Sequence, residues 1–454
     1  MKRFSSARQV LKRQSIGAVP TPWRLVPRVL GAALLATGLT AGPARAESTV
    51  RVATFNVSLY GQAAGEVLAR LRRGDDPQAR RLAEIIQRVR PDVLLLNEID
   101  FDERGEVVRE FHDRYLAVAQ HHVDSPDGAA RPIDYPHRFT ASTNTGRHSG
   151  FDLDRNGKTQ SQPGSAEYGG DAWGYGVYPG QYGMAVLSKF PIHQESIRTF
   201  RNFRWRDMPD AQLPDDPSTP AAADWFSADA IAQFPLSSKS HWDVPIVVAD
   251  RRIHLLASHP TPPVYDGPED RNGHRNHDEL RFWADYIGST EGAAYIYDDA
   301  GRHGGLNVAD KHNAAPATLQ PPASSLQPLF IILGDLNGDP HDGDGPEGIK
   351  LLLASPRVLQ APAPASEGAA EQSRLQAGAN ARHRGEASLD TADARDVPGP
   401  GNLRIDYVLP SSDLRQVAAG VFWPATDDPH FGLVGVEPFP SSDHRLVWVD
   451  LEFE

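Results

Sequence analysis

The amino-acid sequence predicts an α/β fold, in which buried β-sheets are layered with helices. Three observations lead to this prediction. Apolar runs of strand length, rich in Ile, Val and Leu, recur along the chain. Near residue 50 the predicted order is strand, helix, strand, which is how a layered α/β fold opens. The 454 residues, 40% of them hydrophobic, suffice for a large core.

The first elements follow from spacing and from proline. Residues 50–57 form an apolar run and are predicted to be a strand. Pro77 opens a helix whose apolar residues recur at helical spacing, and Pro91 ends it. A buried strand follows at 93–96. Further strands are predicted at 182–188, 244–248, 253–258, 329–333, 404–409 and 445–453, and those at 244–248 and 253–258 form a hairpin.

A second helix is predicted after residue 275. Asn276 fits an N-cap and Glu279 stands three residues later, which is the pattern of a capping box. The helix would then bury one face, which consists of Leu280, Trp283, Ala284 and Ile287.

Three ranges lose this periodicity and are predicted to be insertions on a single catalytic domain, residues 47–454. They lie near 124–180, 204–242 and 361–400, and are rich in Gly, Pro, Asp or Ala. The first is expected to lie on the surface, and the third, which is low in hydrophobic residues, to be mobile. We find no internal repeat.

Residues 1–46 have the pattern of a secretory signal peptide. A basic lead precedes a short apolar stretch at 29–41, and Ala44-Arg45-Ala46 fits a small-x-small cleavage site. A buried core helix is the alternative, but it does not explain why no acidic residue precedes Glu47. We therefore expect an exported protein, periplasmic or extracellular. No apolar run is long enough to predict stable membrane insertion.

Composition restricts the function further. The chain has no cysteine, which excludes disulfides and thiolate zinc sites. It has 46 basic and 59 acidic residues, and eight basic but no acidic residues lie in 1–46, so the remainder carries a net charge of −21. Such a surface repels polyanions at long range. The charge counts modestly against a dedicated nucleic-acid binder.

Polar side chains stand at the ends of the predicted strands, where phosphoester chemistry would place them. Hydrolysis needs a cation, an activated water and a proton donor. The candidates, in chain order, are Asn56, Glu98, His259, Asp335, Asn337, Asp406, Asp443 and His444.

Each candidate also has a plainer explanation. Glu98 is the best carboxylate for Mg²⁺, or else a solvated loop acid. Asn56 binds a metal or satisfies nearby backbone. His259 binds phosphate, donates a proton, or is an ordinary loop histidine. Asp335 and Asn337 are alternate residues, so in an extended backbone they face the same way.

The two acids near His444 suggest an imidazole oriented by a carboxylate. Asp406 ends or interrupts a strand that precedes the Asp443-His444 pair. Such a histidine can act as a general base, and the other carboxylate can lie near the cation. An isolated Asp-His pair is usually a surface feature, but strand ends make a shared site more probable here.

Taken in order, these motifs resemble the endonuclease/exonuclease/phosphatase superfamily, the relatives of deoxyribonuclease I, exonuclease III and bacterial sphingomyelinase. The matching segments run from residue 51 to the C-terminus, and the three insertions match nothing. The segments are residues 53–57, 91–98, 183–188, 258–259, 334–337, 404–408 and 442–444.

The resemblance implies a four-layer α/β sandwich with two central mixed sheets flanked by helices. It implies that Glu98 binds Mg²⁺ or Mn²⁺, with Asn56 beside it and Asp443 completing the cation site. Asp335 and Asn337 would position the phosphate and the water, and Asp406 would orient His444. His259 would contact phosphate or protonate the leaving oxygen. The implied reaction is direct in-line attack of water at phosphorus, with either His444 or Asp335 taking the proton.

Two more patterns are weaker. Asp152, Asp154 and Asn156 copy the first half of a calcium loop whose closing Glu is absent, which leaves a structural Ca²⁺ site as a hypothesis. Arg275 and His277 fall at the predicted helix N-terminus, where they would either contact substrate phosphate or simply belong to a cap.

Three functions are compatible with these patterns. The first is an exported, metal-dependent, nuclease-like phosphodiesterase, expected to be monomeric. The second is a phosphomonoesterase, or a hydrolase of small phosphorylated molecules such as sugars, inositols or lipid headgroups, which the acidic surface favours. The third is a binding protein on an inactive hydrolase fold, which would require the loss of site residues that are all present here.

Overall fold

Two mixed β-sheets form the centre of the computed structural model, which describes residues 49–122, 128–308, 327–394 and 399–453. In the first sheet, only β1 and β2 are parallel neighbours. Its strands, in spatial order, are β12 (Arg415–Val421), β13 (Val447–Glu452), β1 (Thr49–Leu59), β2 (Val93–Ile99), β4 (Met184–Ser188) and β3 (His137–Phe139).

The second sheet is also mixed, with β7 and β8 as its parallel pair. Its strands, in spatial order, are β11 (Asp406–Pro410), β8 (Leu329–Asp335), β7 (Arg251–Ser258), β6 (His241–Val248) and β5 (Arg198–Thr199). A separate two-stranded ladder joins β9 (Ala392–Ala394) to β10 (Gly401–Leu403). The predicted strands and the 241–258 hairpin are confirmed, with bounds shifted by a few residues.

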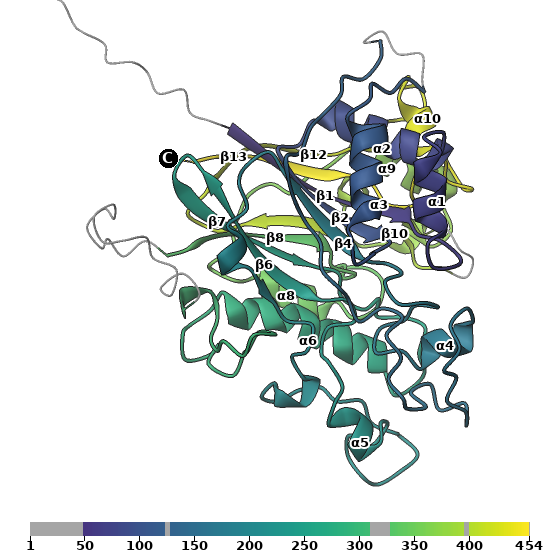
Figure 1. Ribbon diagram of the computed structural model, residues 1–454, viewed down its shortest axis with the longest axis vertical. Helices are drawn as coiled ribbons and strands as arrows, with labels where there is room; N and C mark the ends of the chain where they lie inside the picture. The colour runs from purple at the N-terminus through teal and green to yellow at the C-terminus, as the bar shows by residue number, and fades with distance from the viewer. Residues whose placement is uncertain (1–48, 123–127, 309–326, 395–398, 454) are drawn as a thin grey trace, which may run out of the picture. The chain divides into compact units, whose positions relative to one another are not determined.

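The two sheets pack face to face. Alternate side chains of a strand point to opposite faces of its sheet, so one set fills the core between the sheets and the other set packs against the outer helices. On β8, Ile331 and Leu333 belong to the core shared with β1 and β2, whereas Phe330 and Ile332 face the core on the other side. Helices cover both outer faces, so the predicted four-layer sandwich is confirmed (Figure 1). The outer layers hold mainly α1 (Glu66–Arg72), α2 (Pro77–Val89) and α3 (Glu106–Phe111) on one side, and α6 (Arg271–Tyr286) and α8 (Glu347–Leu353) on the other.

Helix α2 begins and ends where the sequence predicts. Pro77 occupies its first turn, and the carboxylate of Asp76 accepts a hydrogen bond from the Ala79 amide. Its apolar face is buried in the core, and Arg90 in a left-handed conformation ends it before Pro91.

The capping box predicted at Asn276 and Glu279 is wrong. Helix α6 begins at Arg271 with Asp270 at its N-cap, so both residues lie inside the helix and are fully buried. The buried face that we predicted for this helix, with Leu280 and Trp283, is confirmed. The polar residues of its first turns, whose burial the sequence did not indicate, contact the loops that follow β7 and β8.

The predicted insertions contain more structure than expected. The first supplies the edge strand β3 and helix α4 (Ala166–Gly170), and the second supplies α5 (Ala228–Ile231) with a buried aromatic cluster. The third contains α9 (Glu367–Gln376), whose Ala369 is buried in the main core. The described part of this insertion thus contains regular structure, and its mobility stays a prediction. The last helix is α10 (Phe431–Val434), and short helical turns lie at His112–Leu116, Gln194–Ser196, Trp205–Asp207, Asn380–Arg382 and Ala387–Leu389.

Residues 1–46, to which the signal-peptide prediction applies, lie outside the described residues. Within the described ranges, no helix combines the length and the apolar character needed to cross a membrane.

Candidate active site

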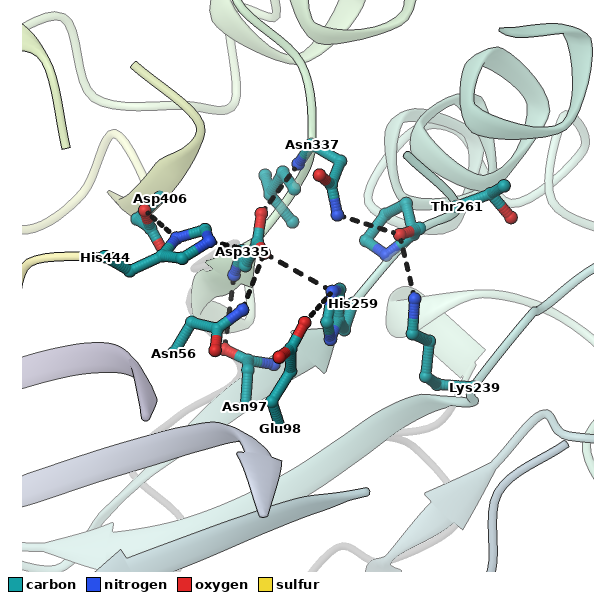
Figure 2. Close-up of polar contacts among 12 residues, drawn as sticks. Asn56, Asn97, Glu98, Lys239, His259, Thr261, Asp335, Asn337, Asp406 and His444 are labelled. Carbon is teal, nitrogen blue, oxygen red and sulfur yellow. Dashed lines mark hydrogen bonds and ion pairs between the residues drawn. The ribbon is translucent and has the colours of Figure 1, made fainter. Parts of the chain in front are cut away.

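The strand ends bring most of the predicted site residues into one cluster (Figure 2). Asn56 is on β1 and Glu98 on β2, in the first sheet. His259 follows β7, Asp335 ends β8 and Asp406 begins β11, in the second sheet. Because the two sheets face each other, these ends meet at one edge of the sandwich.

Asp335 is at the centre of this cluster. Its Oδ2 accepts a hydrogen bond from Asn56 Nδ2 at 3.0 Å and lies 3.3 Å from His259 Nε2 and 3.7 Å from His444 Nε2. Burial acts to raise the pKa of Asp335, but the His444 and His259 imidazoles outweigh it and lower the pKa below its usual value. Asp335 is therefore a buried carboxylate that stays ionised.

His444 is oriented by Asp406, as the sequence predicted. Its Nδ1 lies 2.9 Å from Asp406 Oδ2. Burial acts to lower the pKa of His444, yet Asp406 and Asp335 raise it well above its usual value. Thr391 also holds Asp406, which the sequence did not indicate. Its hydroxyl donates to Asp406 Oδ2 at 2.8 Å and accepts from the Asp406 amide. Nδ1 is thus fixed, and Nε2 faces the cluster.

Glu98 has the features of a cation ligand. Its side chain is 21% exposed, and its Oε1 lies 3.9 Å from His259 Nε2. Burial, and then the charge of Asp443, raise the pKa of Glu98 to about 7. Glu98 and Asp335 belong to one cluster with His259, and the charge of Asp443 acts on Glu98, yet none of these three carboxylates has an Arg or Lys ion pair in the described chain. This oxygen-rich donor set fits Mg²⁺ or Mn²⁺.

Asp443 lies beside this region rather than in the ring of contacts around Asp335. Its Oδ1 accepts from Ser58 Oγ at 2.8 Å, and its charge contributes to the shift at Glu98. Asn56 reaches Asp335 through its amide nitrogen, while its Oδ1 accepts from the Ser58 amide. Asn56 thus positions Asp335 in this structure, and because its Oδ1 keeps a second lone pair, cation binding by Asn56 stays a prediction.

The backbone at three site residues is left-handed, which the sequence did not indicate. Glu98, Asn337 and Ser58 have φ of 57°, 51° and 44°. The prediction that Asp335 and Asn337 project the same way from extended backbone is wrong, because Asn337 leaves the strand. Its side chain instead donates to Pro260 O at 3.1 Å, and its amide donates to Asp335 Oδ1. Non-glycine residues in this conformation cluster at functional sites.

Two residues that sequence reasoning missed complete the cluster. Asn97 links the sheets, since its Oδ1 accepts from the Asp335 amide and its Nδ2 donates to Ser258 O. Lys239 is buried and its charge acts on Glu98 and Asp335. Asn97 was visible as a polar residue inside an apolar run, whereas Lys239 lies in a serine-rich stretch that carries no such signal.

Arg275 and His277 do not join the cluster, because neither lies at a helix N-terminus. The buried Arg275 guanidinium donates to Leu236 O and Pro235 O. His277 contacts its neighbour Asp278 and the side chain of Gln212. The structure gives these side chains packing and positioning contacts, and their predicted substrate contact receives no support.

The candidate calcium loop has one acid that was not predicted. Asp152 and Asp154 lie close to the buried Asp171, with one carboxylate oxygen of each within 4.8 Å of the others. The same carboxylates accept hydrogen bonds from the Asn156 amide and from Leu153 and Gln160. The Asn156 side chain donates to Asp154 through its nitrogen. Calcium binding at this loop stays a prediction.

The fold and the cluster together define a hydrolytic α/β enzyme, a metal-dependent phosphoesterase. The sequence matches the model of the Endonuclease/Exonuclease/phosphatase family over residues 53–444. The chain belongs to this family, which confirms the resemblance.

The solved structures that match this chain are distant in sequence. An endonuclease/exonuclease/phosphatase from Beutenbergia cavernae DSM 12333 is 16% identical, with 89% of this chain and 72% of that chain covered and a TM-score of 0.42. Sphingomyelinase C from Streptomyces griseocarneus is also 16% identical, with 89% and 99% covered and a TM-score of 0.39. TDP2 from Caenorhabditis elegans is 12% identical, with 89% and 75% covered and a TM-score of 0.37. No curated protein matches the sequence.

Proposed function

We propose that this enzyme hydrolyses phosphodiesters by direct attack of water at phosphorus. The observation that carries the proposal is the placement of one ionised carboxylate, Asp335, between His259 and His444, with Asp406 fixing the second imidazole. Such an arrangement can orient a water molecule and accept its proton. The new oxygen–phosphorus bond forms as the bond to the leaving oxygen breaks, and no covalent enzyme intermediate is needed.

The two histidines have different tasks in this proposal. Asp335 Oδ2, which is ionised, orients the attacking water and accepts its proton, while Asp406 holds His444 Nδ1–H and leaves the imidazolium Nε2–H facing Asp335. Burial, and then Lys239, lower the pKa of His259 to about 4. That ring is therefore neutral near pH 7 and suits hydrogen bonding to the phosphoryl group rather than service as a cationic acid.

Glu98 and Asp443 would hold the divalent cation, either Mg²⁺ or Mn²⁺. When bound, such an ion neutralises charge on the phosphoryl oxygens. The chain contributes the carboxylates and a partly exposed entrance at Glu98. The charge of Glu98 acts on Tyr60 and Tyr182, whose ring centroids lie 4.5 Å apart, and burial followed by this charge raises the pKa of Tyr60 to about 12.

One observation favours the alternative, a phosphomonoesterase or a hydrolase of small phosphorylated molecules. The chain is strongly acidic, which disfavours approach of a long polyanion. A panel of plasmid DNA, RNA, bis-p-nitrophenyl phosphate and p-nitrophenyl phosphate separates the two, run with Mg²⁺, Mn²⁺, Ca²⁺ or EDTA. We expect diester turnover that EDTA abolishes. Turnover of the monoester alone would replace the proposed function by the alternative.

We further propose that the enzyme is exported, to the periplasm or the medium, and acts as a monomer. The basic lead, apolar stretch and Ala44-Arg45-Ala46 pattern support export. N-terminal sequencing of the secreted protein should begin at Glu47. Retention of residues 1–46 on the protein recovered outside the cytoplasm would contradict the signal peptide, and a dimer in light scattering would contradict the monomer.

A further inference from the structure

Lys239 is a buried cation beside the active site with almost no direct partner. Lys239 is 7% exposed, and its Nζ lies 3.4 Å from Pro260 O. In the described part of the chain it makes no ion pair within 4.0 Å and no other hydrogen bond. An ammonium group has three donors, so most of its bonding capacity is unused.

The acids that influence Lys239 already have other partners. Glu279, whose charge acts most strongly on it, accepts from the Ser238 amide at 2.7 Å and from the Thr261 amide at 2.6 Å. Asp335 is shared between Asn56 and two imidazoles. Burying a charge without a close partner is costly. A charged ligand that arrives during function would remove this cost.

Other unused groups lie on the same side of the cluster. Asn337 Nδ2 donates at 3.1 Å to Pro260 O, the same oxygen that Lys239 approaches. His259 Nδ1 and Thr261 Oγ1 are buried without hydrogen-bond partners in the described structure. Figure 2 shows Lys239, Asn337, Thr261 and His259 on one side of Asp335, and His444 with Asp406 on the other.

We propose that Lys239 binds the substrate phosphoryl group, donating from Nζ to a non-bridging oxygen alongside Asn337 Nδ2. The inference rests on the proposed function, because it takes the cluster to be a phosphoester site. It assigns the two sides of Asp335 to different tasks. On the side of His444, Asp335 handles the water, and on the other side Lys239 and Asn337 hold the phosphoryl oxygens. Charge-assisted donors of this kind stabilise the charge that develops in the transition state.

The test compares wild type with Lys239→Met, with Lys239→Gln made in parallel. Methionine has a similar length and removes an unpaired buried charge, so we expect wild-type circular dichroism and no loss of melting temperature. Lys189→Met is the matched control, because Lys189 pairs with Asp92 at 2.9 Å just before β2, whose other end carries Glu98. At about 3.3 Å per residue the control lies ~20 Å from the site.

Three quantities are measured: kcat/KM on bis-p-nitrophenyl phosphate and the Kd of inorganic phosphate by calorimetry, both in saturating Mg²⁺, and the Kd of Mg²⁺ in a separate titration. We expect Lys239→Met to lower kcat/KM about 100-fold and to weaken phosphate binding at least ~10-fold, with the Mg²⁺ affinity within about twofold of wild type. Lys189→Met should change none of the three. The phosphate measurement matters because a purely structural lysine would not alter the affinity for phosphate in a folded variant.

The proposal is overturned if a folded Lys239→Met or Lys239→Gln binds phosphate within about twofold of wild type. Failure of both variants to fold would also overturn it, since it would make the charge a folding requirement. These outcomes are distinct from failure of the proposed function, which would show as wild-type enzyme that turns over no phosphodiester in any metal.

Discussion

At the scale of single residues, Asp335 lies between two histidines whose pKa values are shifted in opposite directions. The imidazole of His444 is paired with Asp406, and the two carboxylates raise its pKa well above the usual value. His259 has no hydrogen-bond partner at Nδ1 in the described structure, and burial lowers its pKa to about 4. Asp335 thus lies between His444, which binds a proton more tightly than a free histidine, and His259, which binds one less tightly. At neutral pH we therefore expect a charged ring on one side of Asp335 and a neutral ring on the other.

Removing either member of the Asp335–His444 pair should abolish hydrolysis while the fold persists. Asp335→Asn keeps the shape but loses the negative charge that faces both imidazoles, and His444→Ala removes the ring that Asp406 holds. We expect kcat to fall by at least ~100-fold in each. Steady-state kinetics with matched circular dichroism tests this. Near-wild-type turnover in either variant would exclude that residue from the mechanism.

The residues that the sequence revealed share one physical signature. Glu98, Asp335 and Asp406 are charged groups at the ends of apolar strands, where folding alone gives them no reason to be. Lys239 and Thr391 lie in polar loops, so only the folded chain shows that they reach the cluster. A sequence pattern identifies a residue that is unusual among its neighbours in the chain. Lys239 and Thr391 are ordinary residues for a polar loop, so no pattern marks them.

At the scale of elements, helix α6 holds the active-site loops in place. Asn276, inside this helix, donates through Nδ2 to Thr261 O, Leu336 O and Asn337 O, at 2.8, 3.1 and 3.2 Å. Capping-box reasoning failed here because the Asn-x-x-Glu spacing also occurs in a helix interior. The two side chains satisfy loop backbone instead of helix backbone.

Asn276→Ala should therefore lower both stability and activity. The substitution leaves three buried carbonyls short of a donor, which costs roughly 2 kcal/mol or more of unfolding free energy. Because Asn337 loses its support, kcat should also fall. Urea denaturation and steady-state kinetics measure the two effects. An unfolding free energy within about 0.5 kcal/mol of wild type would show that α6 does not hold these loops.

The third insertion carries an acid whose titration should be visible in stability. Burial, followed by the charges of Asp339 and Asp342, raises the pKa of Asp390 from 3.8 to about 8. Between these values the folded chain holds a proton that the unfolded chain has released. The free energy of unfolding therefore falls as pH rises, by at most about 1.4 kcal/mol per pH unit, and the loss ends above the folded pKa.

Asp390→Asn removes this titration. Its stability advantage over wild type should be near zero at pH 4 and should grow through pH 7. Urea melts of both proteins at several pH values measure it. A difference that does not change with pH would mean that Asp390 is ionised in the folded protein.

The calcium loop is a further prediction at this scale. An ion held by Asp152, Asp154 and Asp171 would stabilise the folded state by mass action. Millimolar Ca²⁺ should therefore raise the melting temperature of wild type, and raise it less in Asp154→Asn. Equal shifts in both proteins, or no shift in wild type, would end the hypothesis.

At the scale of the whole molecule, periodicity in the sequence predicts the strands and α2, and the resemblance implies the four-layer sandwich, but neither predicts the structure of the insertions. The strands and α2 are long enough to show their periodicity. In contrast, α9 and β3 are short or low in apolar residues, and they form because the core and the sheet edge offer them contacts. Tertiary packing decides such segments, so local pattern does not reveal them.

The net charge of the molecule predicts that salt should affect kcat/KM differently for large and for small substrates. A chain that starts at Glu47 carries −21, so it repels a long polyanion more strongly than a small diester. Raising the salt from about 20 to 200 mM shortens the screening length and weakens this repulsion. The ratio of kcat/KM for plasmid DNA to that for bis-p-nitrophenyl phosphate should therefore rise with NaCl at fixed Mg²⁺. A ratio that falls instead would reveal a local basic path for the nucleic-acid backbone, because binding through phosphate contacts weakens with salt. The change of this ratio with NaCl thus distinguishes a hydrolase of small substrates, for which the ratio rises, from an enzyme with a nucleic-acid binding surface, for which it falls.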